Sequence, residues 1–261
     1  MSMKTLRHPF RWLSRPQLLI VFIMICLCVG GLGVIQRSRT VPVLIFDRPL
    51  PSPLPVPVTQ ASCNIVPCVA LTFDDGPDPT VTPRVLDILA RHQVHATFFI
   101  VGSRVAGHEP IVRRAYQAGH EIGNHSWNHP DLSTLPPEQV EEQLTLTQHA
   151  IADAGVPMPR ILRPPYGAVN EMVAAHNHLS VVRWNVDPED WKNHNAPKLT
   201  EQIVATARPG AIILLHDIYP STADALDAAM PRLKQQYQLI TVSQLLNLSP
   251  GDQGQYFSRH Y

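Results

Sequence analysis

After residue 62, short apolar segments alternate with longer segments of helical periodicity. This alternation predicts an α/β fold made of β/α units. The predicted strands are Val69–Phe73, Ala96–Val101, Glu121–Gly123, Ile161–Arg163, Val181–Trp184, Ala211–Leu215 and Leu239–Thr241. The predicted helices are Val81–His92, Pro110–Ala118, Pro137–Ala154, Leu199–Ala207 and Ala223–Gln236. Seven units in about 180 residues are too few for an eightfold barrel of about 250 residues, so we expect a smaller or incomplete barrel.

The N-terminal part has a different pattern, an uncharged apolar run from Leu18 to Ile35 with basic residues on both sides. At about 1.5 Å per residue this run is just long enough to span a hydrocarbon core, and the flanking positive charge places the N-terminus inside. We therefore predict a cytoplasmic basic segment at 1–17 and a transmembrane anchor at 18–35, with the remainder outside the cytoplasm. The alternative is a signal peptide cleaved near Gly31–Gly33, which would release a secreted protein.

Prolines at positions 42, 49, 51, 53, 55 and 57 predict a semi-rigid spacer over residues 36–62. The folded domain is then expected at 63–248. The polar tail at 249–261 is expected to be disordered unless Tyr256 and Phe257 pack back against the domain. No coiled-coil pattern or protein partner is indicated.

Two of the four cysteines lie in the N-terminal apolar run, and two lie at the start of the predicted domain. Cys26 and Cys28 lie in the apolar run, where packing is the ordinary role. Cys63 and Cys68 lie outside it, and in an oxidising compartment either a disulfide or two free thiols fits them. Two cysteines cannot complete a structural zinc site.

The charge balance is uneven along the chain. Seven Lys/Arg and one Asp precede Gln60, whereas fourteen Lys/Arg and twenty Asp/Glu follow from there. The domain is therefore mildly acidic, which argues against nucleic acid as a partner because phosphate binding needs a basic surface. A neutral glycan is compatible with this charge.

Polar clusters follow the predicted strands directly. They are TFDDGP at 72–77, HSWNH at 125–129, RPPYG at 163–167, DPEDW at 187–191 and LLHD at 214–217. Each alone has an ordinary structural interpretation, such as a turn or a chance histidine pair. Active sites of parallel barrels collect at the carboxyl ends of the strands, so five clusters there favour one shared site.

The HSWNH cluster contains two imidazoles four residues apart, which share a face if the segment makes one helical turn. Together with a carboxylate from the first strand, they give an Asp/His/His set with open positions for water and substrate. A metal held in this way can polarise a bound carbonyl and lower the pKa of a bound water.

In order and spacing, these five motifs resemble those of the NodB-like polysaccharide deacetylases, carbohydrate esterase family four, from about Val69 to Leu246. Membrane-anchored peptidoglycan N-acetylglucosamine deacetylases are the most similar members. The resemblance implies a distorted barrel of seven parallel strands and hydrolysis of N-acetyl or sometimes O-acetyl groups. It also implies a divalent metal, usually zinc, with cobalt or manganese as alternatives.

The resemblance assigns roles to the matched residues. Asp75, His125 and His129 would hold the metal. Asp74 would be the general base, and Arg163 would tether Asp74.

Five further residues receive roles from the same resemblance. His216 would be the general acid, oriented and charged by Asp190. The backbone amide of Tyr166 would help to stabilise the oxyanion. Trp191 and Leu214 would line the acetyl pocket.

The resulting hypothesis is metal-dependent N-deacetylation of an extracytoplasmic polysaccharide that contains N-acetylglucosamine, with peptidoglycan favoured because of the anchor. Chitin-type oligosaccharide, poly-N-acetylglucosamine and O-acetylated xylan are the alternative substrates. A non-catalytic, membrane-tethered glycan-binding module is a hypothesis of another class. A non-haem iron oxygenase is a third, disfavoured because its ligands usually come from antiparallel strands. Among the remaining histidines, His194 lies near enough to Trp191 to contact a substrate.

Overall fold

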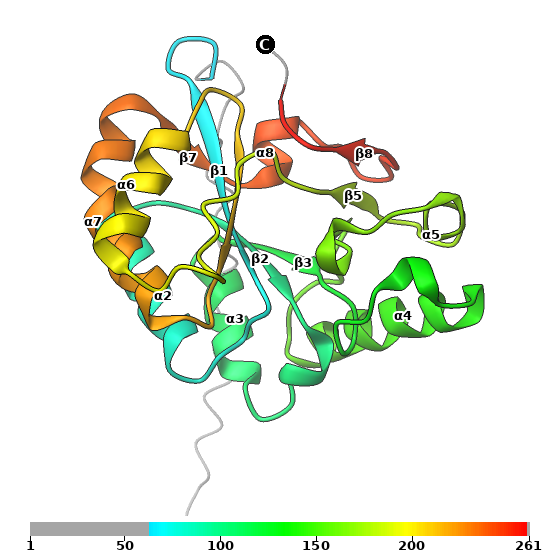
Figure 1. The fold of residues 1–261 in the computed structure, drawn as a ribbon. Helices are drawn as coiled ribbons and strands as arrows, with labels where there is room; N and C mark the ends of the chain where they lie inside the picture. Colours follow the sequence, from blue (N-terminus) through cyan, green and yellow to red (C-terminus); the bar gives the residue numbers. More distant parts are fainter. Residues whose placement is uncertain (1–62, 260–261) are drawn as a thin grey trace, which may run out of the picture. The chain divides into compact units, whose positions relative to one another are not determined.

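The computed structural model describes residues 63–259 and shows a barrel-like sheet of parallel strands (Figure 1). The strands are β1 Cys68–Asp74, β2 Thr97–Ile100, β3 Glu121–Asn124, β4 Ile161–Leu162, β5 Ser180–Val182, β6 Ile212–His216, β7 Gln238–Ile240 and β8 Gln255–Tyr256. Their order is β6-β1-β2-β3-β4-β5-β8, and β7 pairs with the first residues of β1. The predicted α/β class and all seven predicted strands are confirmed, with ends within two residues of those expected.

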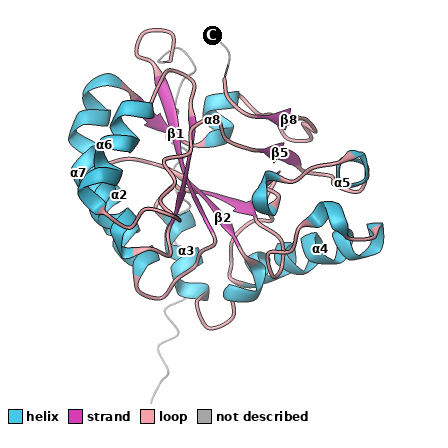
Figure 2. Ribbon diagram, viewed as in Figure 1, coloured by secondary structure: helices cyan, strands magenta, loops and turns pink. Residues whose placement is uncertain are grey.

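The helices lie outside the strands (Figure 2). They are α2 Val81–His92, α3 Glu109–Gln117, α4 Pro137–Asp153, α5 Glu171–Ala175, α6 Ala196–Thr206, α7 Pro220–Gln236 and α8 Val242–Leu246, with short 3-10 turns η2 Gly102–Arg104, η3 Leu132–Thr134 and η4 Pro165–Gly167. All five predicted helices are present. Helices α5 and α8 were not predicted, because about one turn is too short to show a period.

Strand β1 is buried over its whole length, and its alternation separates two environments. Val69, Leu71 and Phe73 belong to the large core cluster that also contains residues of α2 and α7. Ala70 belongs to a second cluster, with residues of β5, β6 and α8. Because side chains alternate along a strand, Asp74 lies on the same face as Ala70, away from the α2 and α7 side. The last residue of β1 therefore carries its carboxylate to the carboxyl end of the barrel.

The C-terminal tail is part of this barrel: for its described residues disorder is wrong, and the alternative, packing of Tyr256 and Phe257 against the domain, is correct. Strand β8 is parallel to β5, with the Val181 N–H donating to the Gly254 carbonyl at 2.8 Å. Ser258 then forms a bridge with Ala211, at the start of β6. At the other end of the gap between β5 and β6, Val186 forms a bridge with Ile213. The tail was misjudged because a two-residue strand with one glutamine gives no strand pattern.

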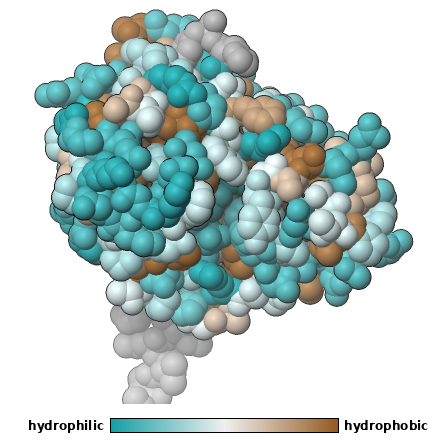
Figure 3. Space-filling view, in the orientation of Figure 1, coloured by the Kyte–Doolittle hydropathy of each residue, from teal (hydrophilic) through white to brown (hydrophobic). Residues whose placement is uncertain are grey.

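Cys63 and Cys68 form a disulfide, which decides between the two alternatives left open for them. Within residues 63–259, no helix combines the length and apolar character needed to cross a bilayer. The predicted anchor at 18–35 and spacer at 36–62 lie outside the described residues. The face shown in Figure 3 is mostly hydrophilic, with apolar residues in scattered groups.

Candidate active site and metal centre

The residues predicted for the site converge at the carboxyl ends of β1, β3, β4 and β6. The pairing of β1 with β6 sets Asp74 directly beside His216. The predicted base and the predicted acid are therefore neighbours on adjacent strands.

Asp75, His125 and His129 form a cluster whose ligand atoms all lie within 4.8 Å of one another. The Asp75 Oδ1 atom is 3.5 Å from His125 Nε2 and 3.3 Å from His129 Nε2. This oxygen is buried and has no hydrogen-bond partner among the described residues. A buried acceptor of this kind ordinarily has a partner, and a divalent cation would provide one. The three side chains therefore fit a metal.

The orientation of His125 supports the same interpretation. Its Nδ1 lies 2.6 Å from the carbonyl oxygen of Arg163. A carbonyl only accepts, so Nδ1 carries a hydrogen, and Nε2 is the ring nitrogen that a neutral His125 would offer to a metal. Metal-binding histidines are commonly oriented by such a second hydrogen bond.

The His125–His129 segment is a loop and makes no helical turn, so another geometry brings the two imidazoles together. Ser126 and His129 have φ of 65° and 61°, in the left-handed region. The Ser126 side chain accepts the His129 N–H at 3.1 Å, and the Asn124 side chain accepts the Ser126 N–H at 2.9 Å. These side-chain contacts turn the chain back and bring His129 to the metal cluster.

Asp74 is held by Arg163, which is fully buried. The Arg163 Nη1 donates to Asp74 Oδ1 at 2.8 Å and to Thr72 Oγ1 at 2.7 Å. Its Nε donates to the Val182 carbonyl, and its guanidinium lies 4.1 Å from the centre of the Phe99 ring. Burial lowers the pKa of Arg163 and the charge of Asp74 opposes this shift. The result is a fixed carboxylate whose Oδ2 lies 3.6 Å from the His125 Nε2.

His216 is paired with the buried carboxylate of Asp190. The His216 Nδ1 lies 2.7 Å from Asp190 Oδ1, and Oδ2 accepts the backbone N–H of His216 and the Thr222 hydroxyl, each at 2.7 Å. Burial alone would lower the pKa of His216, but Asp190 outweighs it and raises the pKa to about 9. The imidazole is therefore protonated at neutral pH, with Nε2–H as its remaining donor.

Tyr166 contacts this centre, Leu214 precedes His216 by two residues on β6, and Trp191 directly follows Asp190 in the chain. Tyr166 has a φ of 60° and a 69% exposed side chain, and its ring packs edge-on to His129 at 4.8 Å between centres. No described group accepts its backbone N–H. Trp191 is about half exposed and Leu214 is buried.

Two residues near His216 were not predicted as part of the site. Tyr219 has its ring 5.8 Å from that of His216 and 5.0 Å from that of His194. Asp217 is buried, and burial raises its pKa to about 7. Asp217 is the last residue of the LLHD motif and Tyr219 follows it by two positions, so their closeness to His216 in the sequence is the available signal.

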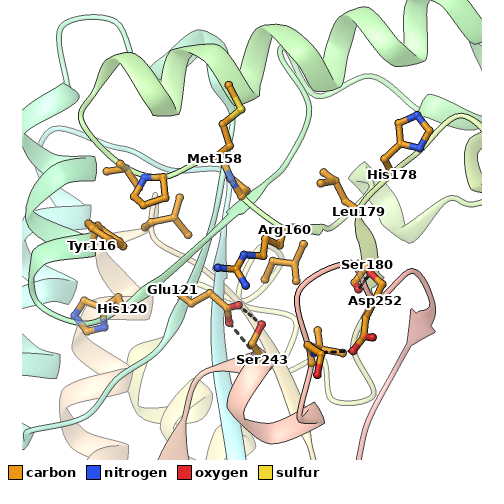
Figure 4. A pocket seen from close by; sticks show the side chains of 18 residues that line it. Tyr116, His120, Glu121, Met158, Arg160, His178, Leu179, Ser180, Ser243 and Asp252 are labelled. Atoms are coloured by element: carbon orange, nitrogen blue, oxygen red, sulfur yellow. Dashed lines mark hydrogen bonds between the residues drawn. The ribbon is translucent and has the colours of Figure 1, made fainter. Parts of the chain in front are cut away.

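A separate cavity of about 370 Å³ lies at the opposite end of the barrel, where β3, β4 and β5 begin (Figure 4). Its Glu121 carboxylate accepts the Ser243 N–H and the Thr97 hydroxyl, each at 3.0 Å. No predicted site residue lines this cavity. The predicted chemistry therefore belongs to the carboxyl end of the sheet alone.

Comparison with known proteins agrees with this geometry. The family model for polysaccharide deacetylase matches residues 62–181. The structure of peptidoglycan deacetylase PdaC from Bacillus subtilis is 42% identical, with a TM-score of 0.67 over 69% of this chain and 90% of that chain. The chain belongs to the polysaccharide deacetylase family.

Two other relatives show the range of this deacetylase family. The peptidoglycan-N-acetylglucosamine deacetylase PgdA of Listeria monocytogenes is 44% identical over 217 residues, which is 82% of this chain. This chain spans only 46% of the length of PgdA. A family 4 acetyl xylan esterase from Clostridium thermocellum, in complex with a cobalt ion, is 36% identical, with a TM-score of 0.69 over 74% of this chain and 100% of that chain.

Proposed function

We propose that this chain is a metal-dependent hydrolase that removes N-acetyl groups from an extracytoplasmic polysaccharide containing N-acetylglucosamine, with peptidoglycan as the favoured substrate. One observation carries the proposal: the unpartnered Asp75 Oδ1 faces two histidine nitrogens, beside a base and an acid in register on β1 and β6.

Asp75, His125 and His129 would hold a divalent metal, and zinc is favoured because an Asp/His/His set suits it. Cobalt and manganese are the alternatives, and the related xylan esterase was solved with cobalt. The chemistry that such an ion supplies when bound is polarisation of the acetyl carbonyl and a lowered pKa of water.

Asp74 would take a proton from the attacking water. Its Oδ1 is occupied by Arg163, so the carboxylate cannot rotate and Oδ2 is the free acceptor. The N–H of Tyr166, which no described group accepts, would donate to the oxygen of the acetyl carbonyl as negative charge develops there.

His216 would give the proton that lets the amine leave. The bond between the acetyl carbon and the sugar nitrogen breaks, and the nitrogen takes the Nε2 proton of the charged imidazole. The products are acetate and a free amino sugar. The raised pKa of His216 supports this role, because a neutral imidazole could not donate efficiently.

The polymer is inferred from relatives and from the predicted anchor. PdaC and PgdA, by name, act on peptidoglycan. The predicted segment at 18–35 would hold the domain on the outer side of the membrane, beside a cell wall. Chitin-type oligosaccharide, poly-N-acetylglucosamine and O-acetylated xylan are the substrates to compare.

The test is to incubate the full chain, loaded with zinc, with each polymer and to measure released acetate and free amines. N-deacetylation produces both in equal amounts, whereas removal of O-acetyl groups produces acetate alone. We expect equal release from peptidoglycan, loss of activity on chelation and recovery when zinc is restored. Absence of acetate from every polymer with zinc bound would contradict the proposal.

Asp74→Asn separates catalysis from glycan binding. The amide keeps an oxygen toward Arg163, so the fold should persist, but it cannot take the water proton. We expect activity to fall by about 10²–10⁴-fold, the usual contribution of general base catalysis, with polymer binding retained. His149→Ala, at an exposed position of α4, is the matched control and should keep full activity.

A further inference from the structure

Asp217 is a buried acid that the proposed mechanism does not use. It is 1% exposed, and its Oδ2 accepts the hydroxyl hydrogen of Thr82 in the first turn of α2. The same hydroxyl accepts the Asp78 N–H at 2.8 Å. The other oxygen, Oδ1, has no hydrogen-bond partner among the described residues. A buried oxygen without a partner is unfavourable for stability, so its presence calls for another explanation.

The carboxyl group of Asp217 lies against Gly76. A Cβ added at Gly76 would lie 2.6 Å from Asp217 Oδ1 and still closer to Oδ2, which is nearer than real Cβ atoms come to any atom. The φ of Gly76 is outside the left-handed region. Its backbone conformation therefore does not require glycine. Glycine is required here because the Asp217 carboxyl group occupies the space that a Cβ would need.

Gly76 is also fixed from the other side. Its carbonyl accepts the Val101 N–H at 3.0 Å, at the end of β2. Gly76 directly follows Asp75, whose φ of 72° is left-handed. The position of the Asp75 backbone therefore depends on the position of Gly76.

We propose that Asp217 is a positioning residue whose carboxyl group, fixed by Thr82, supports Gly76 and so sets the Asp74–Asp75 turn at the level of His216. The contact is steric and needs no charge. Asp217 directly follows β6, which ends at the proposed acid, and Gly76 follows β1 and the metal ligand Asp75. This inference rests on the proposed metal-dependent function.

The test is a double-mutant cycle read by the zinc dissociation constant of the full chain, measured in competition with a chelator. Asp217→Ala should weaken zinc binding by about 10–100-fold, as loss of an outer support usually does. Gly76→Ala should weaken it by at least as much, because its methyl group overlaps the carboxylate. The double variant should bind zinc more tightly than Gly76→Ala alone, because removal of the carboxylate makes room for the methyl group.

Asp217→Asn is the matched control, since the amide has the same shape and keeps an oxygen for Thr82. It should bind zinc within about threefold of the unchanged chain, whereas an effect as large as that of Asp217→Ala would show that charge matters and overturn the proposal. The melting temperature without metal is measured in parallel. A lower melting temperature with an unchanged zinc constant in Asp217→Ala would mean an ordinary structural role and also overturn it.

Thr82→Val is the second variant if Asp217→Ala does not fold, and it should weaken zinc binding in the same direction. Thr82→Ser retains the hydroxyl and should not. A different result would refute the proposed function itself: an unchanged chain that binds no zinc and releases no acetate. If it does both while the zinc constants of these variants stay unchanged, only the role of Asp217 is refuted.

Discussion

Two ionisable side chains of the site are shifted in opposite directions by their neighbours. Burial alone would raise the pKa of Asp75, but His125, His129 and His216 outweigh it and hold the pKa at about 2. Burial alone would lower the pKa of His216, and Asp190 instead raises it to about 9. The carboxylate and the imidazolium are thus both charged across the neutral range, which suits a ligand and a proton donor.

This tuning predicts how Asp190→Asn will behave. The proton of His216 is lost as pH rises through its pKa, so the alkaline limb of the activity profile should lie near pH 9 in the unchanged chain. The neutral amide no longer favours the imidazolium, and burial remains. We expect the limb to move toward or below the ordinary value of 6.5, as measured by the pH dependence of kcat/KM.

Asp224→Asn provides the control for that experiment, because Asp224 forms an exposed ion pair with Arg84 in α2. Its profile should match that of the unchanged chain. An alkaline limb that stays in place in Asp190→Asn would show that His216 is not the group that titrates.

Among the elements, β8 has the least sequence signal and a clear structural role. The carbonyls of Gly254, just before β8, and Tyr256 accept the N–H groups of Val181 in β5 and Arg183 just after it, each at 2.8 Å. The Arg259 N–H then donates to the Gly210 carbonyl, before β6. The two ends of the sheet would otherwise be separated along this part of the gap. The tail therefore fills the gap in the sheet between β5 and β6.

Ending the chain at Asp252 should consequently destabilise the domain. Two backbone donors lose their acceptors, which costs about 1–3 kcal/mol for each one that stays buried. For a domain of about 200 residues, a loss of about 2–6 kcal/mol corresponds to a melting temperature lower by about 4–24 °C. Thermal denaturation followed by circular dichroism would measure the shift, and the zinc affinity should be unchanged.

Phe257→Ala is the comparison variant for the truncation. It keeps the backbone of β8 and removes only a partly exposed ring that lies over Arg183. Its melting temperature should stay close to that of the unchanged chain. A truncated chain as stable as the full one would mean that β8 does not contribute to closing the barrel.

The strands could be predicted because buried parallel strands form apolar runs, and their positions place the five motifs at one end. The short elements could not, since two to five residues show no period. The shape of the His125–His129 loop could not be predicted, because it depends on two left-handed residues held by the side chains of Asn124 and Ser126. Asp217 was overlooked because its contact with Gly76 joins positions far apart in the chain.

For the whole molecule, the main prediction is attachment to a membrane through residues 18–35. In a bacterial host, the full chain should sediment with membranes, resist a high-salt wash and be released by detergent. The domain should be cleaved by a protease added outside the cells. A variant without residues 18–35 should remain in the cytoplasm.

Cleavage after the apolar run would give a different result. The protein would then appear in the medium or periplasm with a new N-terminus near Gly33. An intact N-terminus on a protein that remains in the cytoplasm would contradict both the anchor and the signal peptide.

The pairing of β1 also bears on when, during synthesis of the chain, the proposed hydrolase would become active. The Thr72 hydroxyl and the Ile213 carbonyl that it bonds are 141 residues apart, and β7 lies still later in the chain. A growing chain therefore carries its base for most of the domain's translation before the acid strand exists to pair with it. If the chain is threaded unfolded through a membrane, the proposed base and acid can first meet on the far side, and the proposed hydrolysis could not begin in the compartment where the polymer's precursors are made.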